Sequence, residues 1–168
     1  MKNLVITDKD ISTDVFLNSV VVNLNNINYN RCTGGHECFK KNGECYFNDD
    51  MKLISRWMND CQLIIYITRV KYGCFDIPFK KMLERFIVNT EPFYSIVQGE
   101  SCHLSLSQLN KRLLVIGYGD IDEEEKIIFK DLIEDCSIGY IYSSVNTYFC
   151  KEDELEETLR TFGGVDHV

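Results

Sequence analysis

Proline is scarce in this sequence, with two residues among 168, and no stretch is rich in glycine and serine. The chain therefore lacks the usual signs of a linker, and no internal repeat is visible. Apolar residues make up 45% of the chain and charged residues 26%, which is an ordinary globular composition. We therefore predict a single folded domain over residues 1–168.

Long apolar runs are also missing. No segment approaches the ~20 apolar residues that a membrane-spanning helix needs. The opening residues, MKNLVITDKD, combine a short apolar run with acids and have no cleavage site of the secretory type. The sequence therefore predicts a cytoplasmic protein without a membrane partner.

Clusters of basic residues are the third absence. The 18 Lys and Arg residues are dispersed, the formal net charge is −8, and acids gather in the C-terminal third. Nucleic acids and anionic membranes are recognised by clustered Lys and Arg. The charge pattern therefore argues against a nucleic-acid partner, and the acidic runs are typical of solvated helix faces.

Short apolar segments recur along the chain and predict buried strands. They cover residues 4–6, 20–22, 62–68, 112–118 and 139–145. Amphipathic helical patterns lie between and after most of them. Strands that alternate with helices predict an α/β fold. We expect a flavodoxin-like three-layer sandwich with a five-stranded parallel sheet of order 2-1-3-4-5 and helices on both faces.

Capping residues predict where the helices begin. Asn48 precedes a helical pattern over residues 49–58, and Asp76 precedes another with Pro78 in its first turn. Asp120 and Glu123 have the spacing of a capping box. The helix after them is expected to bury one apolar face, made of Ile121, Ile128, Leu132 and Cys136. The last helix is expected from about Lys151, with a buried face of Leu155, Leu159 and Phe162 and an end at Gly163 and Gly164.

Eight cysteines are many for a chain of this size. In a cytosolic protein they are expected as thiols or metal ligands rather than disulfides. Five stand singly among apolar or small residues and are interpreted as buried small hydrophobes. These are Cys61, Cys74, Cys102, Cys136 and Cys150.

Two stretches resemble the NAD(P)H-dependent FMN reductase and iron–sulfur flavoprotein group. The first, RCTGGHECFKKNGECYFNDDM over residues 31–51, is similar to the group's C-x-G-C-x-x-C…G-x-C…D-D-M segment. Its matching residues are Cys32, Gly34, Cys38, Gly43, Cys45, Asp49, Asp50 and Met51. The second, residues 68–85, resembles the P-V-Y-x-G-x-F-S…L-K-x-x-L-D-R segment after the third strand. Its matching residues are Val70, Gly73, Phe75, Lys80, Leu83 and Arg85.

The resemblance implies a protein that binds FMN at the carboxyl ends of the strands and uses NAD(P)H as co-substrate, with the chemistry supplied by the flavin. It implies a homodimer, because relatives commonly complete the flavin site across a subunit interface. The loops after the third and fourth strands would face the flavin ring. The implied cofactor-binding residues are Thr68, Arg69, Val70, Lys71, Tyr72, Gly73 and Phe75 in the first loop, and Gly117, Tyr118 and Gly119 in the second.

The chain departs from the group after its first strand. The group has a loop there that binds the flavin phosphate, whereas this chain has Asp8, Asp10 and Asp14 and only about a dozen residues before Val20. A crossover with its helix needs at least about 10–12 residues. We therefore predict a shortened first crossover without the phosphate loop. The alternative function is a flavin-free structural or regulatory subunit, paired with an active paralogue.

The cysteine-rich segment departs as well. Gly35 replaces the group's second cysteine, which leaves Cys32, Cys38 and Cys45. Their spacing fits no standard zinc pattern, although His36 could complete a set of four ligands. We predict no bound metal, and a metal- or redox-sensing module remains a third alternative. No nucleophile–base pair stands out, so no catalytic residue is predicted.

Overall fold

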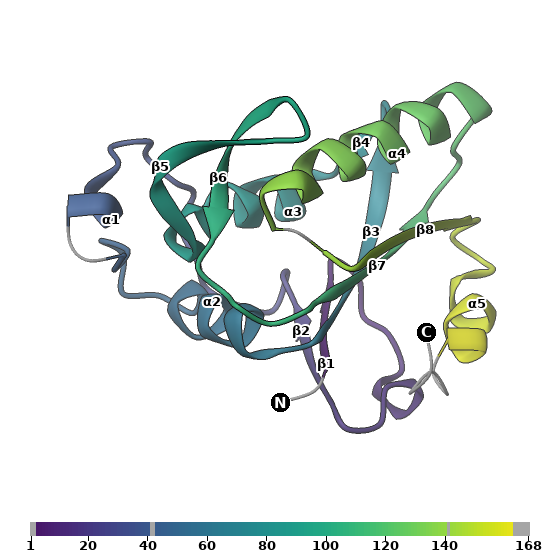
Figure 1. The fold of residues 1–168 in the computed structure, drawn as a ribbon. Helices are drawn as coiled ribbons and strands as arrows, with labels where there is room; N and C mark the ends of the chain where they lie inside the picture. The colour runs from purple at the N-terminus through teal and green to yellow at the C-terminus, as the bar shows by residue number, and fades with distance from the viewer. Residues whose placement is uncertain (1–2, 41–42, 141, 163–168) are drawn as a thin grey trace.

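A central parallel sheet organises the structure, a computed structural model that describes residues 3–40, 43–140 and 142–162 (Figure 1). Across the sheet, the parallel strands lie in the order β2-β1-β3-β7-β8. Their bounds are Asn3–Thr7 (β1), Ser19–Asn23 (β2), Leu63–Lys71 (β3), Arg112–Tyr118 (β7) and Ser144–Cys150 (β8). Numbered along the chain, these parallel strands have the order 2-1-3-4-5, so the predicted flavodoxin-like topology is confirmed.

Three helices pack on one face of the sheet (Figure 1). They are α2 (Met51–Asp60), α3 (Ile77–Leu83) and α4 (Glu123–Ser137). Because side chains alternate along a strand, every second strand residue points to this face. Ile6 and Tyr66 pack there with Met51, Phe79 and Phe129 in one buried cluster.

The opposite face has a thinner cover. It carries α5 (Leu155–Phe162) and the three-residue 3-10 helix η1 (Thr13–Val15). Leu155 and Leu159 of α5, as predicted, pack on Val5 and Ile65 of the sheet. Between β1 and β2, η1 is the helical element, so the shortened first crossover is confirmed. The predicted end of the last helix lies outside the described residues.

Two smaller strand pairs were not predicted. β4 (Cys74–Phe75) folds back antiparallel onto the end of β3. β5 (Thr90–Val97) and β6 (Glu100–Ser105) form a separate hairpin away from the main sheet. Short elements complete the chain: α1 (Glu37–Lys40), η2 (Phe86–Asn89) and η3 (Ile138–Tyr140).

The N-terminal caps of three helices can be compared with the predicted ones. The Asp76 carboxylate accepts a 2.8 Å hydrogen bond from the Ile77 N–H, so the cap of α3 is confirmed. Helix α2 begins at Met51, after Asp50, so the cap predicted at Asn48 is wrong. The capping box of α4 is formed by Asp122 and Glu125 rather than by Asp120 and Glu123.

Two further predictions are correct only in part. The last strand, predicted over residues 139–145, lies further along the chain as β8, Ser144–Cys150, because α4 continues into η3. Helix α4 buries Phe129 and Ile133, whereas Ile128 is 48% exposed. Of the predicted face, Ile121 and Leu132 pack against the core, whereas Ile128 and Cys136 do not, so the prediction is correct in part.

The isolated cysteines are less buried than predicted. Cys61 is fully buried, whereas Cys136 is exposed and the other three are half-buried. In the described part of the chain, no helix is long and apolar enough to cross a membrane.

Candidate functional site at the carboxyl edge of the sheet

The carboxyl ends of β1, β3 and β7 lie side by side. Thr68 and Arg69 of β3 pair in register with Gly117 and Tyr118 of β7. Asp8 follows directly after β1, and its N–H donates to the Ile67 carbonyl of β3. The fold therefore brings together the two loops predicted to bind a cofactor and the acidic segment that replaces the phosphate loop.

The Asp8 carboxylate lies at the centre of this edge. It is 8% exposed and accepts hydrogen bonds from the Arg69 N–H at 2.9 Å, the Thr68 hydroxyl at 3.1 Å and the Tyr118 hydroxyl at 2.8 Å. Burial raises the pKa of Asp8, and the hydrogen bonds offset this only in part. Three donors that face the edge of the sheet are thus already paired with an internal anion.

Charged side chains cover the same site from outside. The Arg69 guanidinium and the Lys9 ammonium lie 5.3 Å and 5.4 Å from the centroid of the Tyr118 ring. Glu152 bridges them, with carboxylate oxygens 2.8 Å from Lys9 Nζ and 2.6 Å from Arg69 Nη2. These hydrogen bonds lower the pKa of Glu152. The positive charges of Lys9 and Arg69, which could bind a phosphate, are therefore neutralised by Glu152 of the same chain.

The loop after β3 is a tight hairpin rather than an open binding loop. Tyr72 and Gly73 form its tip, both with left-handed backbone (φ 53° and 64°), and the Tyr72 side chain is 90% exposed. A Cβ on Gly73 would lie 2.7 Å from Ile128 Cγ2 of α4. Gly73 therefore permits the turn and the close packing of the hairpin on α4.

The remaining predicted residues are mostly structural. Val70 and Phe75 are buried. A Cβ on Gly117 would lie 2.8 Å from Val70 Cγ2, and the Gly119 N–H donates to the Cys150 carbonyl at 3.2 Å. Lys71 is exposed, 3.8 Å from an Asp76 oxygen. The predicted residues lie close together in the fold. Because most of them are buried, closely packed or hydrogen-bonded, few are free to contact a ligand.

The segment after Asp8 does not fit a flavin phosphate. A phosphate site needs free backbone N–H groups at the start of a helix. Here η1 has three residues, and the Ser12 N–H points to the Glu156 carboxylate at 3.4 Å. Asp10 accepts hydrogen bonds from the Asn23 and Asn26 amides at 2.6 Å and 3.1 Å. The Ser12 N–H and the two Asn amides are thus paired with acids, and a phosphate dianion would be repelled by Asp8 and Asp10.

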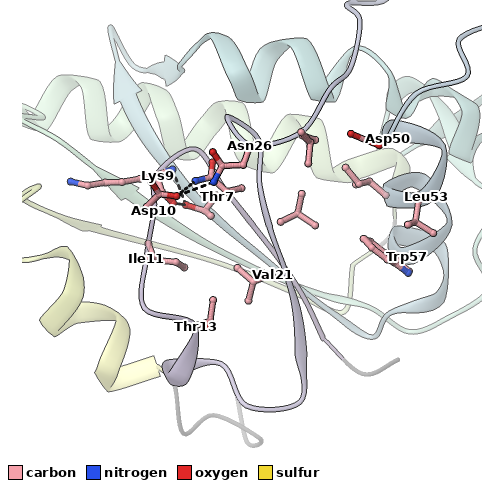
Figure 2. Close-up of a pocket in the computed structure, with 14 residues that line it drawn as sticks. Thr7, Lys9, Asp10, Ile11, Thr13, Val21, Asn26, Asp50, Leu53 and Trp57 are labelled. Carbon is pink, nitrogen blue, oxygen red and sulfur yellow. Dashed lines mark hydrogen bonds between the residues drawn. The ribbon is translucent and has the colours of Figure 1, made fainter.

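A pocket of about 510 Å³ begins beside this segment (Figure 2). It runs from the ends of β1 and β2 along the outer edge of β2 to Leu53 and Trp57 of α2. Its volume is typical of small-molecule sites. Asp10 and Asp50 line it, and Lys9, the one cation among the described residues of its lining, is paired with Glu152. The chemistry of the lining therefore favours an apolar, non-anionic ligand. One edge of β2 is open because β2 is the outermost strand of the sheet, and sequence reasoning did not predict this pocket.

The segment that carries the three clustered cysteines lies elsewhere. Cys32, Cys38 and Cys45 line a smaller pocket of about 210 Å³ together with Arg85. Among the described residues, no three His, Cys, Asp or Glu side chains are arranged to hold a metal ion. The Arg85 guanidinium makes a buried, bidentate ion pair with Asp49, at 2.9 Å and 3.0 Å.

Comparisons with known proteins agree with the fold. No family model matches the sequence, and no curated protein matches it significantly. Solved structures do match over almost the whole chain. An FMN-dependent NADH-azoreductase from Bacillus anthracis, in complex with FMN, has a TM-score of 0.62 at 12% identity, covering 97% of this chain and 96% of its own. An NAD(P)H:quinone oxidoreductase from Methanothermobacter marburgensis has a TM-score of 0.65 at 12% identity, covering 97% and 95%.

These two neighbours are thus an FMN-dependent reductase and an NAD(P)H-dependent oxidoreductase, in keeping with the group that the sequence resembles. At 12% identity the similarity establishes the flavodoxin-like fold. Sequence reasoning identified Asp8 only as a source of repulsion and did not single out Glu152. No local signal marks either role, because Tyr118 is 110 residues from Asp8 and Arg69 is 83 residues from Glu152.

Proposed function

We propose that this chain is a flavodoxin-like relative of the FMN-dependent reductases that carries no flavin and acts as a structural or regulatory partner subunit. One observation carries the proposal: the buried Asp8 carboxylate takes the donors of Arg69, Thr68 and Tyr118 at the edge where this fold binds its cofactor. The Asp8 carboxylate thus accepts the hydrogen bonds that an anionic ligand would otherwise accept at this edge.

The electrostatics of the edge support the same proposal. A flavin phosphate is a dianion, and it would enter beside Asp8 and Asp10 while Glu152 holds the nearby cations. Like charges a few ångströms apart repel, and more strongly where they are partly buried. Release of Arg69 and Lys9 from Glu152 would be needed before either could bind a phosphate.

Exposed apolar residues support a role as a partner subunit. Phe93, Tyr94 and Ile96 of β5 are 76%, 70% and 72% exposed in the single chain. Tyr94 and Ile96, two residues apart on the strand, point to the same side of the hairpin, and exposed apolar surface of this kind is typical of protein–protein interfaces. The hairpin of β5 and β6 is therefore the surface that we propose for the contact with a flavin-bearing subunit of related fold.

The second candidate function is an FMN-dependent oxidoreductase that uses NAD(P)H, as a homodimer. The structural neighbours favour it, since one of them was solved with FMN over a chain of nearly the same extent. FMN would supply the hydride and electron transfer. The loops at Arg69–Gly73 and Tyr118–Gly119 are the parts of this chain that would face its ring.

A flavin-binding test separates the two candidates. The full chain, purified without added cofactor, is examined for flavin absorbance and then titrated with FMN and, separately, with riboflavin. Riboflavin is the matched ligand because it has the same ring and no phosphate. We expect no flavin in the purified protein and no saturable binding of either compound. Stoichiometric FMN that survives gel filtration would establish the oxidoreductase and refute the flavin-free subunit.

A further inference from the structure

The pocket of about 510 Å³ lies along the open edge of the sheet (Figure 2). In the described part of the sheet, β2 is the outermost strand and has β1 as its one neighbour. Ile11 of the crossover lies on one side of β2, and Leu53 and Trp57 of α2 lie on the other (Figure 2). Within the described lining no residue belongs to the β5–β6 hairpin, so this surface is separate from the contact proposed for a flavin-bearing subunit.

The edge of β2 presents backbone groups that have no partner strand. The Leu24 N–H, just after β2, donates to the Thr7 carbonyl of β1 at 2.8 Å. Successive residues of a strand direct their backbone groups to opposite neighbours, so Val22 also bonds to β1 and the N–H and carbonyl of Val21 point outward. Among the described residues, no turn or side-chain hydrogen bond takes up either of these two groups. They are therefore free to pair with an added strand.

The sequence of β2 contains no feature that would block such pairing. Edge strands are commonly protected by proline, by charged side chains or by a bulge. β2 has the sequence SVVVN over Ser19–Asn23, and its register with β1 continues without a shift along the whole strand. An unprotected apolar edge of this kind is typical of a surface that another chain covers.

Apolar side chains line this edge on both faces of the sheet. Ile11 and Val21 pack against the buried cluster on the α5 face. Ile27 and Trp57 pack against the cluster on the α2 face. Because the side chains of an extended segment alternate between the two faces of a sheet, a strand added to β2 would place successive side chains against apolar surface on both sides.

The charges beside the edge favour a basic segment. Asp10 and Asp50 line the pocket and are exposed, and neither forms a salt bridge among the described residues. Their hydrogen bonds come from neutral amide groups, which leave both negative charges uncompensated. Lys9 of the lining is already paired with Glu152. A second copy of this chain, with a net charge of −8, would bring like charge to this lining, whereas Lys or Arg would be attracted.

We propose that β2 binds an extended segment of a partner protein as an additional strand of the sheet. The segment is rich in apolar β-branched residues and is flanked by Lys or Arg. Its main chain pairs with the outward N–H and carbonyl of Val21, and its apolar side chains contact Ile11 and Trp57. Its basic residues lie beside Asp10 and Asp50. In this mode of recognition the main-chain hydrogen bonds supply affinity and the side chains supply specificity.

The direct test titrates the full chain with the peptide acetyl-Lys-Val-Val-Thr-Val-Val-Lys-amide. Trp57 is the one tryptophan of the sequence and lines the pocket, so its fluorescence reports binding. We expect a saturable change, and about tenfold weaker binding of the peptide in which Glu replaces both Lys residues. Amide hydrogen exchange locates the contact. The Val21 N–H is expected to gain protection in the complex, whereas the Val22 N–H is protected already in the free chain.

Two N-methylated forms of the basic peptide test the pairing of the strands. Alternate amides of an added strand face β2, and the others face solvent. Methylation of one alternate set is expected to weaken binding about tenfold, because it removes donors from the pairing. Methylation of the other set is expected to leave the affinity unchanged. Equal effects of the two sets would contradict strand addition.

Variants of the chain test the same contact from its other side. Val21→Pro removes the outward N–H without loss of a bond to β1, a position at which edge strands tolerate proline. We expect about tenfold weaker binding with the fold retained, whereas Val21→Thr binds like the wild type. Asp50→Asn should weaken binding of the basic peptide about threefold. Asp60→Asn is its control, because Asp60 is exposed at the other end of α2 and does not line the pocket.

Three results would overturn the proposal. The first is the absence of saturable binding of the basic peptide to the wild-type chain. The second is equal binding of the basic and acidic peptides. The third is a wild-type dimer that Val21→Pro dissociates, because it would assign the edge of β2 to a second copy. The wild-type titrations do not depend on whether the variants fold.

Discussion

The Tyr118 hydroxyl donates a 2.8 Å hydrogen bond to the carboxylate of Asp8, 110 residues away in the chain. This contact joins the end of β7 to the residue after β1, and Asp8 also accepts from the Arg69 N–H at the end of β3. In a doubly wound sheet, the loops at this edge commonly meet around a ligand. Here an internal carboxylate connects them, so the arrangement of the loops at this edge depends on Asp8.

Removal of the Asp8 side chain should destabilise the fold substantially. In Asp8→Ala the Arg69 N–H loses its acceptor and cannot rotate, while the hydroxyls of Thr68 and Tyr118 lose theirs. Each buried unpaired donor costs about 1–3 kcal/mol, and the two hydroxyls can partly re-pair. We expect a loss of about 3 kcal/mol in the free energy of unfolding, measured by urea denaturation at pH 7.

Asp10→Ala is the matched control for this substitution. Asp10 is a neighbouring aspartate whose hydrogen bonds to Asn23 and Asn26 are exposed. Substitutions at such surface positions usually change stability by about 0.5 kcal/mol or less. Equal losses in the two variants would contradict the central role of Asp8.

The pH dependence of stability should identify Asp8 as a carboxylate that is costly to ionise. Burial raises its pKa above the ordinary value of about 3.9. The unfolded chain therefore ionises this group at a lower pH than the folded chain, and the contribution of Asp8 to stability falls as pH rises through that interval. The neutral variant Asp8→Asn lacks this titration.

The measurement compares the free energy of unfolding of the wild type and Asp8→Asn from pH 4 upward. We expect the wild type to lose stability relative to Asp8→Asn as the pH rises, until the folded carboxyl is fully ionised. A difference that is constant with pH, or that grows in favour of the wild type, would show that the hydrogen bonds outweigh the burial.

Local sequence patterns predicted the elements that depend on local chemistry. The strand from Arg112 to Tyr118 was predicted with its observed ends, and the cap at Asp76 was predicted with its partner helix. The capping box of α4 was displaced because Asp120 and Glu123 have the same spacing as Asp122 and Glu125. The sequence contains both pairs with capping-box spacing. In the structure the turn after β7 places Asp122 and Glu125 at the start of α4.

Long-range relationships could not be predicted in the same way. The sequence indicates that the acids after β1 would repel a phosphate. The burial of the Asp8 carboxylate, however, depends on hydrogen-bond donors from β3 and β7, which the local sequence does not reveal. The β5 hairpin exposes apolar residues such as Phe93 and Ile96, so its strands lack the alternating pattern that marks a half-buried strand. Such features follow from the assembled sheet and not from any one segment.

The buried ion pair between Asp49 and Arg85 should show the opposite pH dependence to Asp8. Burial alone would raise the pKa of Asp49, but the hydrogen bonds from Arg85 and the Asn30 N–H lower it below its ordinary value. Its contribution to stability is therefore present above about pH 4 and is lost as the pH falls through the folded pKa.

Asp49→Asn tests this pair. Removal of one partner leaves the Arg85 charge buried without compensation, which costs about 3–5 kcal/mol in comparable pairs. We expect a loss of this size at pH 7 by urea denaturation, shrinking as the pH is lowered below 4. Asp50→Asn is the control, since the Asp50 carboxylate is exposed and accepts a single hydrogen bond, from the Asn28 N–H. A loss at Asp49 that does not shrink in acid would argue against the ion pair as its cause.

Gly73 should be far more sensitive to substitution than Gly99, although both occupy the second position of a two-residue hairpin turn. Their backbones are left-handed, with φ of 64° and 90°, and each follows a residue with φ of 53°. A Cβ on Gly99 would meet nothing within 4 Å, whereas a Cβ on Gly73 would lie 2.7 Å from Ile128. Gly99→Ala therefore carries only the backbone strain, about 1–2 kcal/mol.

Gly73→Ala carries this strain together with a clash against α4, for which overpacking adds about 1–3 kcal/mol. We expect a clearly larger loss of stability than in Gly99→Ala, measured by urea denaturation. Introduction of Ile128→Ala should reduce the difference between the two glycine variants in part, because it removes the clashing Cγ2 and leaves the Cβ of residue 128, at 2.8 Å, and the strain. The double variant thus separates the packing of the β3–β4 hairpin on α4 from the conformation of its turn. Equal losses at Gly73 and Gly99 would indicate that the hairpin moves away from α4 without cost and would contradict the close packing of the two elements.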